Sequence, residues 1–184
     1  METQSFAIEQ SRLPRINWGG IWGGVFVGLG IQIVLTALGL GIGLMDIDPN
    51  ATEPLMRLPV SVEVWSGLAW IFSAFMGAYV AAWLSGSFLR SSGIFHGMVT
   101  WGFMLSALMF DMTVMMGFLI AAKYGAFSGI NGSTAAPSIE TLDTMCWWLF
   151  AAGFVSLGFA YLGGRIGVRA AQESIGEQKM YRAA

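Results

Sequence analysis

The stretch Trp70-Ile-Phe-Ser-Ala74 recurs later in the chain, without a gap, as Trp148-Leu-Phe-Ala-Ala152. At the same offset, Ala82-Trp-Leu-Ser-Gly86 lies on Ala160-Tyr-Leu-Gly-Gly164. Each copy belongs to a segment that consists of two long apolar runs. We therefore predict an all-α integral membrane protein whose four transmembrane helices form two helical hairpins, repeated in parallel.

The composition favours a membrane protein over a soluble one. The 184 residues are 55% hydrophobic and 11% charged, with a mean hydropathy of +0.65. Charged residues make up roughly a quarter of a typical soluble domain, whereas a bilayer removes the need for a polar exterior. The net charge of −2 gives no electrostatic reason to expect nucleic-acid binding. Cys146 is the single cysteine, which excludes an intrachain disulfide and a multi-cysteine metal site.

Four stretches are long and apolar enough to cross a bilayer core, which needs about 20 helical residues. Backbone groups in lipid must bond within their own segment, so each stretch is predicted to be a helix. The predicted spans cover about 16–45, 64–89, 94–122 and 144–168, within one transmembrane domain over 16–168. Residues 1–15 and 169–184 are predicted to be cytoplasmic tails.

Most of the positive charges fall on one side of the predicted membrane. Seven of the nine Lys and Arg residues precede the first span, lie in an expected tight turn at Arg90-Ser-Ser-Gly93, or lie at the end of the last span and after it. Only Arg57 and Lys123 fall on the other side. This bias predicts a multi-pass protein with both termini in the cytoplasm. Spans one and three then run the same way, so the repeat axis lies along the membrane normal.

Small residues follow one another at four-residue spacing on the predicted spans, and residues four apart share a helix face. Small side chains there let two helix backbones approach closely and gain van der Waals contact. Two interpretations stay open: packing within the four-helix bundle, or contact with another protein through span one. The candidate packing or partner residues are Gly20, Gly24, Gly28, Gly39, Gly43, Gly77 and Gly164.

Asp111 is the one ionisable residue deep within a predicted span. A charged carboxylate at mid-membrane costs about 2.5–3.5 kcal/mol, so such residues usually face a bundle interior or a cavity. The positions three and four residues away are apolar, so a partner has to come from another helix. Gln32, at a similar depth on the first span, is the candidate. A proton relay, an ion site or a single structural hydrogen bond would each explain Asp111.

His96 is the only histidine and lies at the start of the third span. It is either an interfacial or packing histidine or the axial ligand of a haem or chlorin. His96 and Asp111 are roughly 22 Å apart along a helix, which is too far for a catalytic pair. The methionines of this span suit Cu(I) but serve equally as flexible core residues. We predict no metal and no cofactor, with haem or chlorin at His96 as the alternative.

Two segments carry a family resemblance. The run Ile16-Asn-Trp-Gly-Gly-Ile-Trp-Gly-Gly24, continued by Leu35-Thr-Ala-Leu-Gly-Leu-Gly-Ile-Gly43, resembles the opening of small bacterial membrane proteins often labelled PhnA-like. Gly93-Ile-Phe-His-Gly-Met-Val-Thr-Trp101 resembles the second signature of that family, a His-Gly followed by a Trp. The resemblance covers the first three spans and implies a four-helix protein of a bacterial inner membrane. It implies no catalytic residues, and the label does not imply phosphonate chemistry.

The sequence shows no phosphate-cradling loop, hydrolase elbow or His/Glu metal helix. We therefore predict a non-enzymatic integral membrane protein, an accessory or scaffolding subunit that packs in the lipid bilayer against other membrane subunits or itself. One alternative is a small oligomeric transporter or channel that uses Asp111. The other is a haem- or pigment-binding membrane subunit that uses His96.

Overall fold

A computed structural model describes residues 16–43, 60–86, 89–123 and 139–183. These ranges contain four helices: α2 (Trp18–Gly43), α3 (Val60–Leu84), α4 (Arg90–Lys123) and α5 (Ile139–Ala183). Each is long and apolar enough to cross a membrane. The prediction of an all-helical chain with four such helices is confirmed, while the hairpin repeat stays a prediction.

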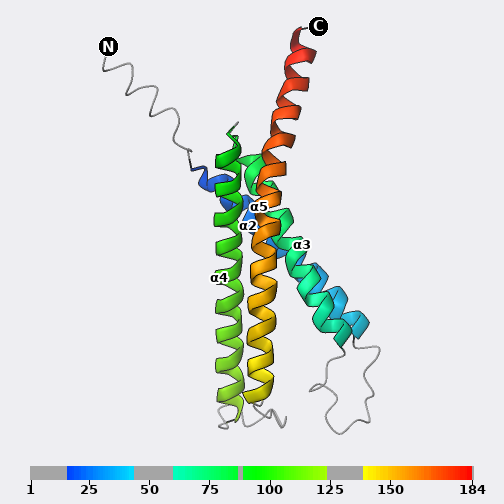
Figure 1. Ribbon diagram of the computed structural model, residues 1–184, viewed down its shortest axis with the longest axis vertical. Coiled ribbons are helices and arrows are strands. Elements are labelled where there is room, and N and C mark those ends of the chain that lie inside the picture. Colours follow the sequence, from blue (N-terminus) through cyan, green and yellow to red (C-terminus); the bar gives the residue numbers. More distant parts are fainter. Residues whose placement is uncertain (1–15, 44–59, 87–88, 124–138, 184) are drawn as a thin grey trace, which may run out of the picture.

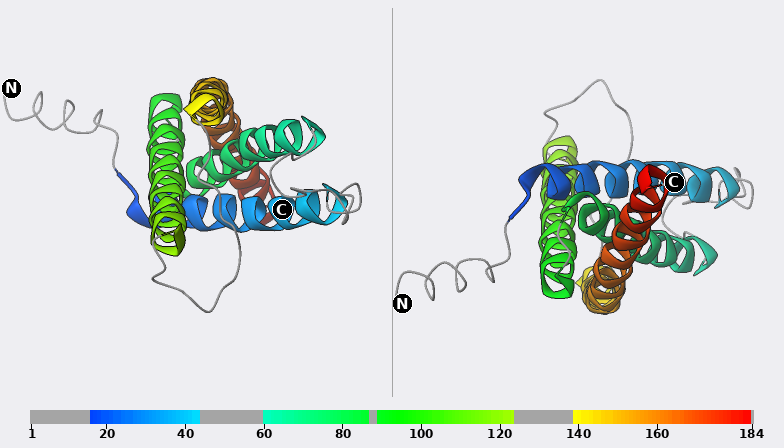
Figure 2. Two further views of the ribbon diagram at one scale, coloured as in Figure 1. Left: turned by 90° about the horizontal axis from the view of Figure 1, so that it is seen from below. Right: turned by 90° about the horizontal axis from the view of Figure 1, so that it is seen from above.

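The four helices run alternately in opposite directions, and α3 is the central one (Figure 1). In the described part of the chain, α3 packs against α2, α4 and α5, whereas α2 and α5 do not touch. The α2–α3 pair leans away from the α4–α5 pair toward the end where α2 and α4 finish (Figure 1). Figure 2 shows the same divergence along the long axis, with α2 and α3 extending away from α4.

The connection between α3 and α4 lies earlier than predicted. The chain leaves α3 after Leu84, and Gly86 has a φ of 64°, a left-handed conformation that glycine adopts at no steric cost. The backbone N–H groups of Ser92 and Gly93 donate to the carbonyl of Leu89, at 3.0 and 3.3 Å. The expected turn at Arg90–Gly93 is therefore wrong, because these residues form the first turn of α4.

The last predicted span and the predicted C-terminal tail form one helix. The 45 residues of α5 are about 68 Å long at the standard rise, more than twice a typical hydrocarbon core. Its final turns project beyond the other helices (Figure 1). The described part of 169–184 is thus a helical continuation of the span. The predicted tail 1–15 lies outside the described residues.

The interior of the bundle is built from small residues, and many large apolar side chains point outward. Ala74, Ala78, Ala81 and Ala82 of α3 are fully buried, and the larger core residues Ile21, Val25, Trp70 and Met104 pack together. By contrast, the exposed fractions of Phe26, Ile33, Phe110 and Phe154 are 69%, 70%, 72% and 70%. This distribution is typical of helices that pack closely through small residues and present large side chains to lipid.

Candidate functional site

Three of the candidate packing glycines on α2 lie directly against α3. A Cβ atom at Gly24 would collide with the carbonyl oxygen of Gly77 and lie 2.6 Å from the Cβ of Ala81. A Cβ atom at Gly20 would lie 3.0 Å from the carbonyl oxygen of Ala81, and one at Gly28 would lie 2.6 Å from the sulfur of Met104. The stripe on α2 therefore serves contact within the chain, and any side chain larger than hydrogen would push the helices apart.

The side chain of Trp65 on α3 packs against Gly39 on α2. A Cβ atom there would overlap the indole of Trp65, whose Nε1–H donates a 2.8 Å hydrogen bond to the carbonyl oxygen of Leu35. This contact joins α2 to α3 near the far end of α2. The candidate Gly43 ends α2, and its surroundings lie outside the described residues.

Gly164 brings α4 and α5 together. A Cβ atom at Gly164 would lie 2.6 Å from the carbonyl oxygen of Gly93, and one at Gly97 would lie 2.9 Å from the carbonyl oxygen of Ala160. Both glycines of α4 fall in the first turns of the helix, so α4 and α5 are closest where α4 begins. The candidate glycines whose surroundings are described, including Gly77 against Gly24, all act in packing within the chain.

Ser156 is a fully buried hydroxyl that joins three helices. It accepts hydrogen bonds from the indole N–H groups of Trp70 on α3, at 3.1 Å, and Trp101 on α4, at 2.9 Å. The Ser156 hydroxyl itself donates a hydrogen bond to the carbonyl oxygen of Gly153, at 2.8 Å. One hydroxyl has two acceptor lone pairs and one donor, so Ser156 uses its full capacity. Ser156 lies two four-residue steps before Gly164 on the same helix, and this spacing alone does not reveal its role.

His96 is fully buried, and both of its ring nitrogens are engaged. Nε2 accepts a hydrogen bond from the backbone N–H of Asn17, at 2.9 Å. Nδ1 lies 2.7 Å from the carbonyl oxygen of Ser92, so it carries the proton and donates. The neutral tautomer follows from this pairing. Because neither nitrogen has a free lone pair, this arrangement gives His96 no means of ligating a haem or chlorin.

The partner of His96 is also the N-cap of α2. The side-chain oxygen of Asn17 accepts from the backbone N–H of Gly20, at 3.2 Å, which is the usual role of asparagine at that position. Its amide nitrogen donates to the carbonyl oxygen of Leu84, at 3.2 Å. Asn17 therefore connects the start of α2 to the end of α3 and, through His96, to α4.

The predicted pair of Gln32 and Asp111 does not form. The amide nitrogen of Gln32 donates to Thr36 Oγ1 at 3.1 Å, and its Oε1 is buried without a partner. Asp111 is exposed, and within the described ranges no group hydrogen-bonds or pairs with it. A similar depth along two helices was not enough, because α2 leans away from α4 beyond the contact of Gly28 with Met104 (Figure 1).

The face of α4 that carries Asp111 is the one that faces the bundle. Thr100 and Met104 are fully buried, and Asp111 follows Met104 by seven residues, which is two turns and returns to the same face. The inward face thus continues to Asp111 but is uncovered there. Among the described residues, the fully buried hydroxyls of Ser73 and Thr100 have no hydrogen-bond partner.

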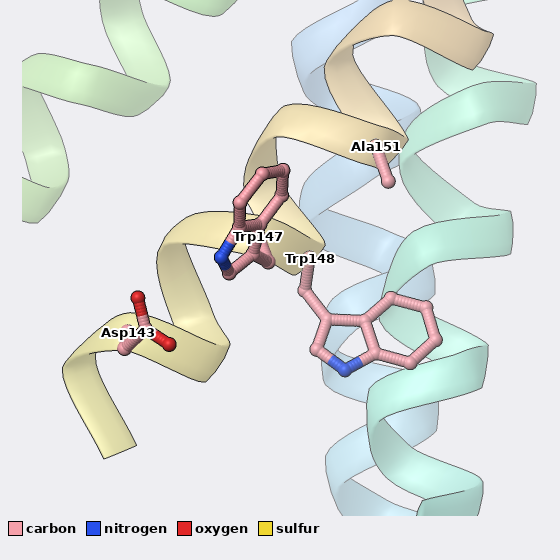
Figure 3. Close-up of a pocket in the computed structure, with 4 residues that line it drawn as sticks. All are labelled: Asp143, Trp147, Trp148 and Ala151. Carbon is pink, nitrogen blue, oxygen red and sulfur yellow. The ribbon is translucent and has the colours of Figure 1, made fainter. Parts of the chain in front are cut away.

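A shallow, open pocket of about 430 Å³ lies on the first turns of α5. It is lined by Asp143, Trp147, Trp148 and Ala151. Figure 3 shows the carboxylate of Asp143 and the indole of Trp148 pointing in different directions. Asp143 is the one charged residue among the described residues that line it. Within the described ranges, no group of three or more His, Cys, Asp and Glu residues could hold a metal ion.

Comparison with known proteins does not assign a family. No protein-family model, curated protein or solved structure matches this chain. The resemblance to the PhnA-like membrane proteins therefore stays a prediction.

Proposed function

We propose that this chain is a non-enzymatic integral membrane protein that assembles with other membrane-embedded chains as an accessory or scaffolding subunit. Four helices of sufficient length and apolarity support insertion in a membrane. The outward orientation of large side chains supports it as well, since such a surface is stable in lipid and costly in water. We place both termini in the cytoplasm of a bacterium, following the distribution of Lys and Arg.

The observation that carries the proposal of assembly is Asp111. Its carboxylate lies within a stretch long and apolar enough to cross a membrane, is exposed, and pairs with no described group of its own chain. An ionised carboxylate at the centre of a transmembrane helix costs about 2.5–3.5 kcal/mol or more, and exposed charged residues within a span are rare. A second chain that covers Asp111 would remove this penalty, and the uncovered inward face of α4 offers it a place to pack.

The glycine stripes support the proposal less than their spacing alone indicated. Gly20, Gly24 and Gly28 are occupied by α3 and α4 of the same chain, so they leave no close-approach surface for another protein. The surface available for assembly is formed instead by exposed apolar side chains, including Phe110 and Val114 on α4, which flank Asp111 in sequence.

Purification from native membranes in a mild detergent tests the proposal. We expect the wild-type chain to migrate as an assembly larger than one copy, and Asp111→Leu to shift part of it to the size of one copy. Asp143→Leu, at an exposed acidic residue outside the apolar stretch of α5, is the matched control and should leave the assembly intact. Recovery of the wild type only as a monomer without a second protein would contradict the proposal.

A small transporter or channel is the second candidate. Ser73 and Thr100 carry fully buried hydroxyls that have no partner in the described part of the chain, and Asp111 continues the same face of α4 as Thr100. Such groups could coordinate a proton or ion on a polar path. In liposomes, Asp111→Asn should abolish proton or cation flux if this candidate is right, and unchanged flux or no flux in the wild type would exclude it.

A further inference from the structure

We propose that the chain that covers Asp111 is a different protein, and that it contributes a transmembrane helix with a Lys or Arg at the depth of Asp111. This inference rests on the proposed function, because it names the kind of partner with which the subunit assembles. It is carried by the surroundings of Asp111, by the donors on the same helix, and by the positions of the positive charges in the sequence.

Asp111 is exposed although it lies on the inward face of α4. Thr100 and Met104, which lie on that face, are fully buried, and Met104 packs against Gly28 of α2 and Gly77 of α3. Two turns later the face is uncovered, and Asp111 is exposed. In a membrane, the occupant of this face has to satisfy its own backbone groups, which a transmembrane helix does and an extended segment does not.

The carboxylate of Asp111 needs a hydrogen-bond donor. An ionised carboxylate only accepts hydrogen bonds, so its partner has to donate. The two hydroxyls nearest to Asp111 on α4 already donate to their own helix: Ser106 to the carbonyl of Gly102 and Thr113 to that of Met109, both at 2.8 Å. Within the described residues no group of this chain supplies the donor, so we assign it to a second chain, and a cation satisfies a carboxylate better than a neutral donor does.

Among the described residues, a second copy of this chain offers no Lys or Arg at the depth of Asp111, since Lys123 lies about 18 Å further along α4. Between Arg90 and Lys123 the sequence of α4 contains no Lys or Arg, and neither do residues 18–43 or 60–84. On α5 the positive charges of Arg165 and Arg169 lie near the end that packs against the first turn of α4. Copies inserted in the same orientation would keep these charges far from Asp111 and would place like charges at equal depth.

A bound metal ion is a poorer occupant than a basic helix. Within the described ranges, Asp111 does not belong to any group of three or more potential metal-ligating residues. A divalent ion held by one carboxylate would lack the six or more oxygen ligands that Ca²⁺ takes and the octahedral set that Mg²⁺ demands. A Lys or Arg side chain needs only the single carboxylate.

A synthetic helix tests the inference in lipid vesicles. The probe is a Leu/Ala transmembrane peptide of about 22 residues with one central Lys, and the comparison peptide has Leu at that position. The full-length protein is labelled at Cys146, its single and exposed cysteine, and association is measured by energy transfer. We expect the Lys peptide to bind the wild type about tenfold more tightly than the Leu peptide.

Variants at position 111 show whether this preference depends on the carboxylate. Asp111→Asn should abolish the preference for Lys, whereas Asp111→Glu should keep it. Asp143→Asn is the matched control and should bind both peptides as the wild type does. Because Asp111 is exposed, these changes remove no packing, and circular dichroism of each variant verifies that the helices are retained.

Three results would overturn the inference: equal binding of both peptides by the wild type, a Lys preference that survives Asp111→Asn, or self-association that depends on Asp111. If a different protein still co-purifies from native membranes while the Lys preference is absent, the inference fails and the proposed function stands. If the wild type is also monomeric in native extracts, both fail.

Discussion

The backbone N–H of Asn17 donates a 2.9 Å hydrogen bond to Nε2 of the buried His96, and so joins the first turn of α2 to the inward face of α4. The other ring nitrogen donates to the carbonyl of Ser92. The single histidine of the chain therefore holds the start of α2 against α4 through a hydrogen bond. This geometry leads to the first two predictions.

Replacing His96 should destabilise the bundle. His96→Ala removes the acceptor of the Asn17 N–H and leaves a cavity, and an unsatisfied polar group of this kind costs about 1–3 kcal/mol. The measurement is unfolding in mixed detergent micelles, followed by circular dichroism. Phe95→Ala, at a neighbouring residue whose side chain is 40% exposed, is the control. Equal stability of His96→Ala and the wild type would show that the hydrogen bond is unimportant.

The same geometry predicts that the purified protein does not take up haem. Both imidazole nitrogens are engaged, and an iron ligand needs a free lone pair. Titration of the folded protein with hemin should give no absorption band that depends on His96. A ligand-shifted band that is present in the wild type and lost in His96→Ala would contradict this prediction.

Close helix approach predicts a sharp difference between two glycines of α2. Gly24→Ala places a methyl group against the backbone of Gly77 and the side chain of Ala81, so it should destabilise the α2–α3 contact by about 1–3 kcal/mol. Gly30 has open space around it, and Gly30→Ala should be neutral or stabilising by up to about 1 kcal/mol. The measurement compares the unfolding midpoints of the two variants in one detergent. Equal changes of the midpoint in both variants would contradict the close packing of Gly24 against α3.

Ser156 should matter far more than its size indicates. Ser156→Ala removes the shared acceptor of Trp70 and Trp101 and leaves two indole N–H groups without it, so we expect a loss of about 2–4 kcal/mol. Ser106→Ala, at an exposed serine that bonds only to its own helix, should change stability by less than about 0.5 kcal/mol. Ser156→Thr retains the hydroxyl and should recover part of the loss. A Ser156→Ala variant as stable as Ser106→Ala would exclude the three-helix role.

The sequence was informative where the pattern is local. Long apolar runs predicted four helices, and glycines at four-residue spacing predicted close packing, because both depend on residues of one helix. The sequence predicts a turn at Arg90–Gly93, because a charge and a glycine close together are typical of a turn. In the structure α4 already begins at Arg90, and the left-handed residue is Gly86. The close contacts of Gly93 with Val168 and Gly164 of α5 explain why that glycine lies inside a helix.

Contacts between helices were harder to predict. Gln32 and Asp111 have similar depths in the sequence, but the lean of α2 away from α4 separates the faces that carry them. The pairing of Asn17 with His96 and the shared acceptor Ser156 depend on helix rotation and crossing, which apolar composition does not determine. No periodic signal distinguishes Ser156 from the other small residues of its stripe.

Photo-crosslinking beside Asp111 in native membranes tests the central claim most directly. Phe110 and Phe154 have nearly equal exposed fractions, 72% and 70%, and each can be replaced by photoreactive benzoylphenylalanine. We predict that position 110 gives a discrete protein adduct that is lost with Asp111→Leu, and that position 154 gives a weaker adduct or none. The absence of a protein adduct at position 110, or one that persists unchanged with Asp111→Leu, would contradict assembly through this face.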